Sequence, residues 1–222
     1  MVVRATECLP PADKNIFVCR DDHLSESSID NVLYKHFENS EIVCVSELTE
    51  GQASTCLLAR EKLTENAALT IGACDNAMVY DQQAFEKIMN DPTTDAIIWT
   101  FRNNPAVLQN PSMYGWVKID DSDNALEVSV KIPISDTPMK DHAVIGAFSF
   151  TKAKDFLECT DAMIAENRRV KNEFYVDMAM NLAIERGLRV KVFEVDSYIC
   201  WGTPQDLQTY EYWERYFSSK NS

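Results

Sequence analysis

One aspartate at the end of an apolar run offers the clearest chemistry in this sequence. Asp75 and Asn76 follow the stretch 68–74, a pattern that predicts a buried strand of a parallel sheet. Ligands of open α/β sheets gather at the carboxyl ends of such strands. A carboxylate placed there can hold Mg²⁺ against a substrate phosphate, whereas Asp-Asn pairs also commonly cap turns. This stretch alone leaves both interpretations open.

Other residues could contribute to the same chemistry, each with an ordinary structural alternative. Gly51 separates a predicted strand from a helix, where backbone can approach a ligand and the helix N-terminus favours anions. Gly146 lies within an apolar strand, as glycines at close approaches often do. Lys131 ends a strand and could be merely solvated, and Glu173 could simply charge a helix start. His23 falls in a predicted loop, where solvation and a metal role are both open.

Strand and helix patterns alternate along the chain and must position these residues. We expect strands at 15–20, 41–48, 68–74, 96–101, 143–150 and 189–195, with helices over 29–37, 56–63, 81–90, 153–159, 161–184 and 206–217. Residues 114–119 and 125–132 predict a β-hairpin with an acidic turn. We expect the aromatic-rich last helix to pack on the domain. The alternation predicts βαβ units and a single domain over residues 1–222.

Composition excludes some functions. A net charge of −14 argues against general nucleic-acid binding, which needs basic patches. No apolar run approaches the length that spans a bilayer, so we expect no membrane partner. Seven cysteines are scattered singly, without a CxxC pair, which indicates a reducing cytoplasm rather than a disulfide framework or a zinc site. An acidic protein can still bind a small phosphorylated substrate through backbone N–H groups, a few lysines and a metal.

The order of these landmarks resembles the sugar-phosphate nucleotidylyltransferases, also called the nucleotidyl transferase family. The resemblance extends over some 150 residues of the chain, and no single landmark is specific. The landmarks are Gly51-Gln52-Ala53, Asp75-Asn76, Lys131-Ile132-Pro133, Gly146, Asn172-Glu173 and Trp201-Gly202-Thr203-Pro204. The fold it implies is an α/β Rossmann-like three-layer sandwich with a mostly parallel sheet and a small β-hairpin insertion.

The resemblance also implies roles for these residues. The nucleotide-binding set would be Gly51, Gln52, Ala53 and Asn76. The substrate-binding set, facing the sugar, would be Gly146, Asn172 and Glu173. The catalytic pair would be Asp75, which binds Mg²⁺ between nucleotide and sugar phosphates, and Lys131, which neutralises charge near the sugar phosphate. Catalysis in this family is mainly alignment and charge stabilisation.

Two features depart from the family pattern. The family opens with a strand and a glycine-rich loop bearing an Arg and a Lys, which have no counterpart here. We therefore expect a domain truncated at its N-terminus relative to the family, with two unpaired sheet edges that favour self-association. At the later metal position, Cys200 stands where many relatives have an aspartate, and thiols bind Mg²⁺ poorly. Asp196 is then the candidate second ligand beside Asp75.

The interpretation that follows is Mg²⁺-dependent transfer of a nucleotidyl group from a nucleoside triphosphate to a sugar phosphate, with release of pyrophosphate, in nucleotide-sugar and polysaccharide biosynthesis. A non-catalytic module that binds a nucleotide sugar is the alternative. A metal-dependent glycosyltransferase is a weaker third, because it would usually carry Asp-x-Asp where this chain has Asp75-Asn76-Ala77. A homo-oligomer is compatible with each.

Overall fold

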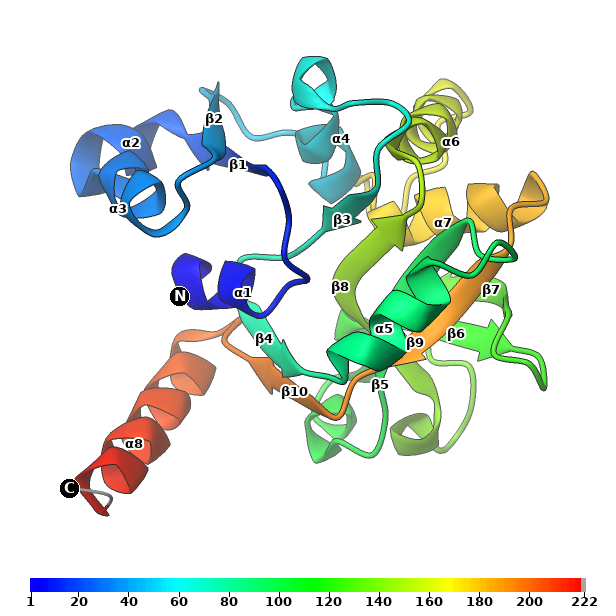
Figure 1. Ribbon diagram of the computed structural model, residues 1–222. Helices are drawn as coiled ribbons and strands as arrows, with labels where there is room; N and C mark the ends of the chain where they lie inside the picture. The colour runs from blue at the N-terminus through cyan, green and yellow to red at the C-terminus, as the bar shows by residue number, and fades with distance from the viewer. Residues whose placement is uncertain (221–222) are drawn as a thin grey trace.

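The strand β5 (Ala96–Phe101) is buried at every position, so it has to lie inside a sheet that is covered on both faces. The computed structural model describes residues 1–220 and places β5 within a six-stranded sheet (Figure 1). The order is β7-β6-β8-β5-β9, and β3 also pairs with β8. The bounds are β3 Leu69–Ile71, β6 Gly115–Ile119, β7 Ala125–Val130, β8 His142–Phe150 and β9 Val190–Glu194.

The sheet is mixed rather than mostly parallel. β5 and β9 pair in parallel, whereas β8 runs antiparallel to its three partners β3, β5 and β6. Strands β3, β5, β6 and β9 therefore share one direction, and β8 runs against them from the middle. The α/β class is confirmed. The hairpin β6–β7 is also confirmed, and it belongs to the main sheet through the β6–β8 pairing.

Two hydrophobic clusters on opposite faces of the sheet make the three layers. One cluster joins Phe148 of β8 to the helices α6 (Ala153–Ala165) and α7 (Val176–Glu185). The other joins Trp99 of β5 to α5 (Gln82–Met89). Alternate residues of β5 face opposite clusters, as the two-residue period of a strand requires.

The first two strands form a separate unit. β1 (Asn15–Arg20) and β2 (Ser40–Val45) pair in parallel and carry α2 (Asp21–Ser27) and α3 (Ile29–His36), apart from the main sheet (Figure 1). Within the described residues, β1 pairs only with β2, and β3 only with β8. Each therefore keeps one edge without a strand partner.

A bulge in β8 shapes the centre of the sheet. Ile98 of β5 pairs with Phe148 and Thr100 pairs with Val144, so three residues of β8 oppose the single residue between them. Gly146 lies in that bulge with φ +93°, a conformation that suits glycine. The bulge leaves the carbonyl of Ile145 available to Nδ2 of Asn76, at 3.0 Å.

A short antiparallel ladder lies beside this bulge. β4 (Asn76–Val79) pairs with β10 (Ser197–Cys200), and α1 (Val2–Glu7) packs against it through Ala5. The strand expected at 68–74 is thus shorter than predicted and antiparallel to its neighbour, and Asp75 lies in the turn between β3 and β4. Alternation of polarity indicates a strand but not its direction.

Several helix boundaries differ from those expected. The segment Asp21–His23 is the first turn of α2 rather than a loop. The helix expected at 56–63 begins earlier, as α4 (Gln52–Leu57), and a 3₁₀ turn follows at Arg60–Lys62. The break expected near Lys171 extends from 166 to 175, between α6 and α7. Further 3₁₀ turns lie at Pro105–Leu108, Pro111–Met113 and Pro138–Lys140.

The last helix, α8 (Pro204–Lys220), is not packed on the domain along its length, contrary to expectation. It has no buried residue and extends away from the sheet (Figure 1). Its first three turns contact the domain, through packing of Leu207 and Tyr210 near Trp201 and through the bonds of Arg4 to Tyr210 and Glu214. None of the helices in the described part of the chain is long and apolar enough to cross a membrane.

The edge strand β7 is satisfied by a side chain, which gives a test of the fold. Nδ2 of Asn181 donates to the Val128 carbonyl and its Oδ1 accepts from the Val128 N–H, both at 2.7 Å. Replacing Asn181 with Ala should lower the unfolding free energy by about 1–3 kcal/mol, measured by urea denaturation, because the backbone of Val128 loses both partners. Asn31→Ala on the exposed side of α3 is the control and should change little. Equal effects of the two substitutions would contradict this account.

Candidate functional site

The loop after β2 is joined to the segment that precedes α7. The N–H of Phe174 donates to the Glu50 carbonyl at 2.7 Å, and the N–H of Ala53 donates to the Phe174 carbonyl at 3.0 Å. Gly51 has φ +124°, and a Cβ there would lie 2.6 Å from the Phe174 carbonyl oxygen, so this approach needs glycine. The structure therefore brings together two predicted sets, Gly51-Gln52-Ala53 and Asn172-Glu173.

The Asn172-Glu173 pair lies on a tight turn. Val170 and Glu173 exchange two backbone hydrogen bonds of 3.0 Å, and Lys171 and Asn172 both have positive φ, as a type I′ turn requires. Arg169 fixes the turn from outside by pairing with Glu50 at 2.8 Å and lying 4.1 Å from the Phe174 ring centroid. The side chain of Glu173 stays exposed, within reach of solvent and ligands.

Lys131 lies against the same segment. Its Nζ is 5.2 Å from the centroid of the Tyr175 ring and donates to the carbonyl of Met113. Burial, together with a hydrogen bond to Glu173, raises the pKa of Tyr175 to about 12. The phenol therefore stays protonated at neutral pH. The predicted catalytic lysine and the predicted sugar-binding glutamate are thus linked through one tyrosine.

A buried carboxyl group, Asp177, lies beneath this cluster. It is 8% exposed, at the second position of α7, and a Cβ on Gly115 would meet its Oδ1 at 2.1 Å. Gly115 thus leaves the space that the carboxyl group occupies. Burial raises the pKa of Asp177, while the positive charge of Lys131 acts in the opposite direction.

Asp75 is held in place by its neighbours on both sides. The carbonyl of Asp75 accepts from the Trp201 N–H at 2.7 Å, and the adjacent Asn76 is anchored to Ile145 in the bulge. Asn76 is 5% exposed, so its amide is engaged within the protein. Gly146 faces this turn, because a Cβ there would lie 3.6 Å from Cβ of Ala73 and 4.0 Å from Nδ2 of Asn76.

The side chain of Asp75 faces the Trp201-Gly202 turn. A Cβ on Gly202 would lie 3.4 Å from Oδ2 of Asp75 and 3.5 Å from Sγ of Cys200. Asp206 is near, 3.9 Å from that sulfur, but its carboxylate already accepts from the N–H and hydroxyl of Thr203. Of the two carboxylates beside this turn, Asp75 and Asp206, only Asp75 accepts no hydrogen bond from the described residues. No group of three metal-ligating side chains occurs within residues 1–220.

Asp196 lies at the other end of the β4–β10 ladder. Cys200 pairs with Asn76 and Ser197 pairs with Val79, so Asp75 flanks one end and Asp196 the other. At about 3.3 Å per residue the two are separated by on the order of 15 Å. The structure does not bring these two carboxylates together.

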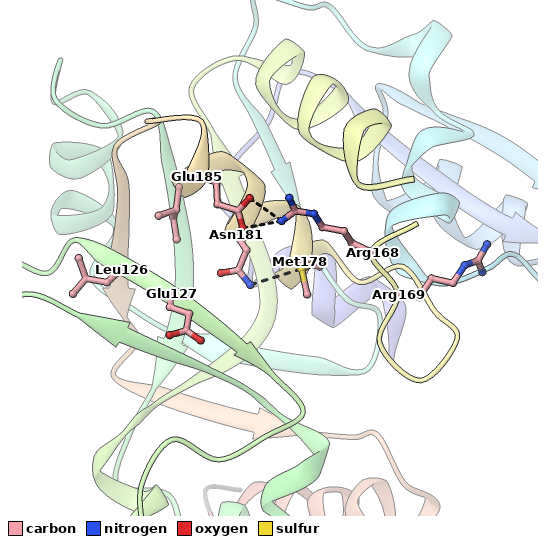
Figure 2. Close-up of a pocket in the computed structure, with 8 residues that line it drawn as sticks. Leu126, Glu127, Arg168, Arg169, Met178, Asn181 and Glu185 are labelled. Carbon is pink, nitrogen blue, oxygen red and sulfur yellow. Dashed lines mark hydrogen bonds and ion pairs between the residues drawn. The ribbon is translucent and has the colours of Figure 1, made fainter. Parts of the chain in front are cut away.

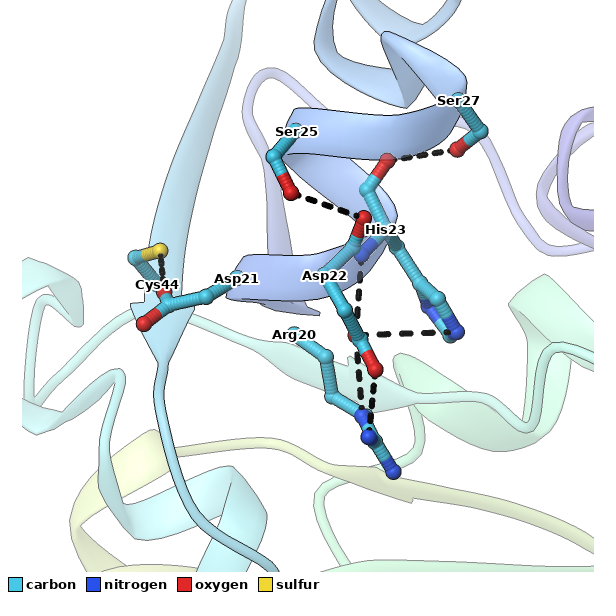
Figure 3. A network of polar contacts seen from close by, with 7 residues as sticks. All are labelled: Arg20, Asp21, Asp22, His23, Ser25, Ser27 and Cys44. Atoms are coloured by element: carbon cyan, nitrogen blue, oxygen red, sulfur yellow. Dashed lines mark hydrogen bonds and ion pairs between the residues drawn. The ribbon is translucent and has the colours of Figure 1, made fainter.

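His23 belongs to a different network, on the β1–β2 unit (Figure 3). Its Nε2 lies 3.9 Å from Oδ1 of Asp22, which also accepts a hydrogen bond of 3.0 Å from Nε of Arg20. Asp21 pairs with the thiol of Cys44 instead. Arg20 lowers the pKa of Asp22 through its hydrogen bond, so this exposed cluster is a charge-compensated helix start.

A groove of about 500 Å³ runs between β7 and α7 (Figure 2). Arg168 on its wall is paired with Glu185 at 2.7 Å and with Glu166 at 2.6 Å. None of the predicted site residues lines it; the lining residues are Leu126, Glu127, Arg168, Arg169, Met178, Asn181, Ile184 and Glu185. The groove therefore borders the candidate site through Arg169 but contains none of its predicted residues.

Three residues near the site, Tyr175, Asp177 and Asp206, were not predicted from the sequence. Tyr175 and Asp177 lie two and four residues after Glu173, but nothing in their pattern indicates that Tyr175 contacts Lys131 or that Asp177 is buried. Asp206 carried a readable signal, because Thr203-Pro204-Gln205-Asp206 has the form of a capping box with proline at the first helical position. Thr203 and Asp206 do cap each other, with bonds of 3.1 and 3.2 Å.

Comparison with solved structures identifies the fold. The chain is similar to a nucleoside-diphosphate-sugar pyrophosphorylase from Vibrio cholerae RC9, with a TM-score of 0.69, 18% identity, and coverage of 87% of this chain and 78% of the other. It is similar to a protein assigned as a glucose-1-phosphate thymidylyltransferase from Bacillus anthracis, with a TM-score of 0.67, 16% identity, and 94% and 78% coverage.

A third similar structure is the inositol-1-phosphate CTP transferase from T. maritima, with a TM-score of 0.65, 14% identity, and 90% and 75% coverage. No family model matches the sequence, and no curated protein matches it. All three structural neighbours are sugar-phosphate nucleotidyltransferases or their equivalents for inositol phosphate. The chain therefore has the Rossmann-like nucleotidyltransferase fold that the sequence predicts.

The buried carboxyl group gives a pH-dependent prediction. Because the pKa of Asp177 is raised on folding, the folded state holds the proton more tightly, and Asp177 makes folding less favourable as pH rises above its unfolded pKa near 3.9. Asp177→Asn should therefore raise the melting temperature at pH 7.5 and leave it nearly unchanged at pH 3. Asp30→Asn, at the second position of α3 but only half-buried, is the matched control. A pH-independent effect of Asp177→Asn would refute the assignment.

Proposed function

We propose that this chain transfers a nucleotidyl group from a nucleoside triphosphate to a sugar phosphate or a related phosphorylated alcohol, with release of pyrophosphate. The main support for this proposal is that the fold places predicted site residues from distant parts of the sequence next to one another. The loop at Gly51, the turn at Glu173 and Lys131 form one cluster, and Asp75, Gly146 and Gly202 form a second.

Strand β8 connects the two clusters. Gly146 faces the turn of Asp75, and Val144, two residues earlier, lies with Asp177 around the α-carbon of Gly115. A ligand spanning these clusters would meet the Gly51 loop, Glu173 and Lys131 at one end, and Asp75 with the backbone of Gly146 and Gly202 at the other. That arrangement suits a substrate with a base, phosphates and a polyol, as in the molecules named for the structural neighbours.

Each predicted site residue has a defined role in this proposal. The loop at Gly51, Gln52 and Ala53, whose backbone is held by Phe174, presents Gln52 to the nucleotide base. Lys131 offsets phosphate charge, and Glu173 accepts hydrogen bonds from hydroxyl groups of the acceptor. Attack of the acceptor phosphate oxygen on the α-phosphorus forms one P–O bond and breaks the bond to pyrophosphate, so the protein contributes mainly alignment and charge stabilisation.

Mg²⁺ fits the donor set only as a shared ion. Asp75 offers one carboxylate, and Mg²⁺ in phosphate sites often takes one or two carboxylates with substrate oxygens and water as the other ligands. Bound there, it would supply positive charge between the phosphate groups. Cys200 is a poor ligand for it, and Asp196 lies at the far end of the ladder.

Asp75 is the residue to test first. Asp75→Asn should abolish Mg²⁺-dependent pyrophosphate release and weaken Mg²⁺-dependent triphosphate binding at least about tenfold in isothermal titration. The unfolding free energy should change by less than about 1 kcal/mol, because the backbone carbonyl of Asp75, which holds the turn, is kept. Asp196→Asn is the matched control and should behave as the unaltered protein. Reversal of the two results would move the metal to Asp196.

Cys200 allows a gain-of-function test. Cys200→Asp sets a second carboxylate beside Asp75, so it should tighten Mg²⁺ binding by about tenfold in the same titration. Cys200→Asn, similar in size and uncharged, should not. If both substitutions leave Mg²⁺ affinity unchanged, Asp75 and position 200 do not face a common ion.

A nucleotide-sugar binding module without catalysis is the second candidate. The soft thiol of Cys200 beside Asp75 favours it, because it reduces the hard oxygen ligands that a catalytic Mg²⁺ requires. Titration with nucleoside triphosphates and nucleotide sugars, alongside an assay for pyrophosphate, separates the two functions. Binding without pyrophosphate release would support the module.

A further inference from the structure

The outer part of α8 carries an exposed aromatic face. Tyr212, Trp213, Tyr216 and Phe217 are 61%, 49%, 38% and 57% exposed. Their rings contact one another: Trp213 stacks with Phe217 at 5.9 Å between centroids, and Tyr216 meets Trp213 edge-on at 5.8 Å. Large apolar side chains gathered on one exposed helix mark an interaction surface more often than a solvated one.

Tyr212 and Tyr216 of this face are directed away from the body of the protein, whereas Trp213 lies at the flank of α8 and Phe217 lies beyond the last attached turn. The opposite side of α8 is the attached one, through Tyr210 against Trp201 and Glu214 against Arg4. At 100° per residue, Tyr212 and Tyr216 lie roughly opposite Tyr210 and Glu214 on the helix. The body of the same chain therefore cannot cover Tyr212 and Tyr216 without releasing these bonds.

We propose that the aromatic face of α8 is a self-association surface, on which α8 of a second copy packs antiparallel. This inference is independent of the proposed enzymatic function. A shallow groove of about 570 Å³ runs along this side of the helix, lined by Gln208, Glu211, Tyr212, Arg215, Tyr216 and Ser219. On the α8 helix of a second copy, the same residues form a ridge of side chains, and such a ridge can pack into this groove.

The charges on this face select the direction of packing. Glu211 precedes Arg215 by one turn, and the two pair at 3.0 Å within the helix. In an antiparallel pair that crosses at position 213, Glu211 lies opposite Arg215 of the second copy, whereas in a parallel pair like charges would meet. The face is locally neutral, so two chains of net charge −14 can approach there.

The available area suits a weak dimer. An aromatic side chain can bury roughly 150–250 Å², so Tyr212, Trp213 and Tyr216, each about half exposed, give on the order of 600 Å² over two copies. The flanking groove residues bring the total to about 1,000–1,200 Å², the lower end for specific interfaces. Association in the micromolar range follows.

Sedimentation velocity of the full chain from about 1 to 200 µM tests the proposal. The unaltered protein should pass from monomer to dimer across this range. Tyr212→Ser with Tyr216→Ser should weaken association about 100-fold, because both rings lie at the centre of the contact. Tyr34→Ser, which removes a tyrosine 50% exposed on α3, is the matched control and should leave the dimer intact.

Charge exchange tests the antiparallel arrangement. Glu211→Arg alone should weaken the dimer about tenfold, because arginines then face each other, and adding Arg215→Glu to the same chain should restore it. Restoration also excludes misfolding as the cause of the loss. A chain that stays monomeric at 200 µM, or a dimer unaffected by the tyrosine pair, would overturn the proposal. Failure of the second charge change to restore association would overturn the antiparallel arrangement.

Discussion

The bulge in β8 is the constraint on which the candidate site depends. β8 pairs with three strands, so its residues would ordinarily have every backbone group in the ladder. The positive φ of Gly146 releases the Ile145 carbonyl, and Asn76 bonds to it. An unpartnered buried carbonyl would cost about 1–3 kcal/mol, so the amide of Asn76 has a fixed position. Asp75 precedes it by one residue, and its location is set by this single bond and by the Trp201 N–H.

Antiparallel pairing explains which residues can act with Asp75. The ladder β4–β10 places the Trp201-Gly202 turn beside Asp75 and carries Asp196 to the far end. Asp196 and Cys200 are four residues apart, which in a helix would be about one turn, or roughly 6 Å. In a strand the same four residues extend over roughly 13 Å. The pairing therefore gives Asp75 a thiol and a capped carboxylate as neighbours, which limits the metal chemistry to ions shared with a ligand.

Strands buried on both faces could be predicted from sequence, because a short, unbroken apolar run bounded by polar residues indicates such a strand. β5 matches its expected limits of 96–101, and β8 begins one residue before its expected start. Strand direction could not be predicted, since the alternation in β3 is the same either way. Within the described residues, the short strands β4 and β10 pair only with each other. Their apolar runs are too short to predict a strand from the sequence. The candidate site residues came from the resemblance. The burial of Asp177 could not be predicted, because it depends on the space left by Gly115, far away in sequence.

Local charge decides how an acidic chain can bind a phosphate. Glu50 near the candidate site is paired with Arg169, so its charge is offset. Asp177 lies beneath Lys131, but burial raises its pKa and disfavours its ionised form. The Tyr175 ring beside Lys131 also has a raised pKa, because of burial and its hydrogen bond to Glu173. Burial thus disfavours negative charge on the carboxyl group next to Lys131, in a chain whose net charge is −14, and this local balance is what the proposed phosphate binding depends on.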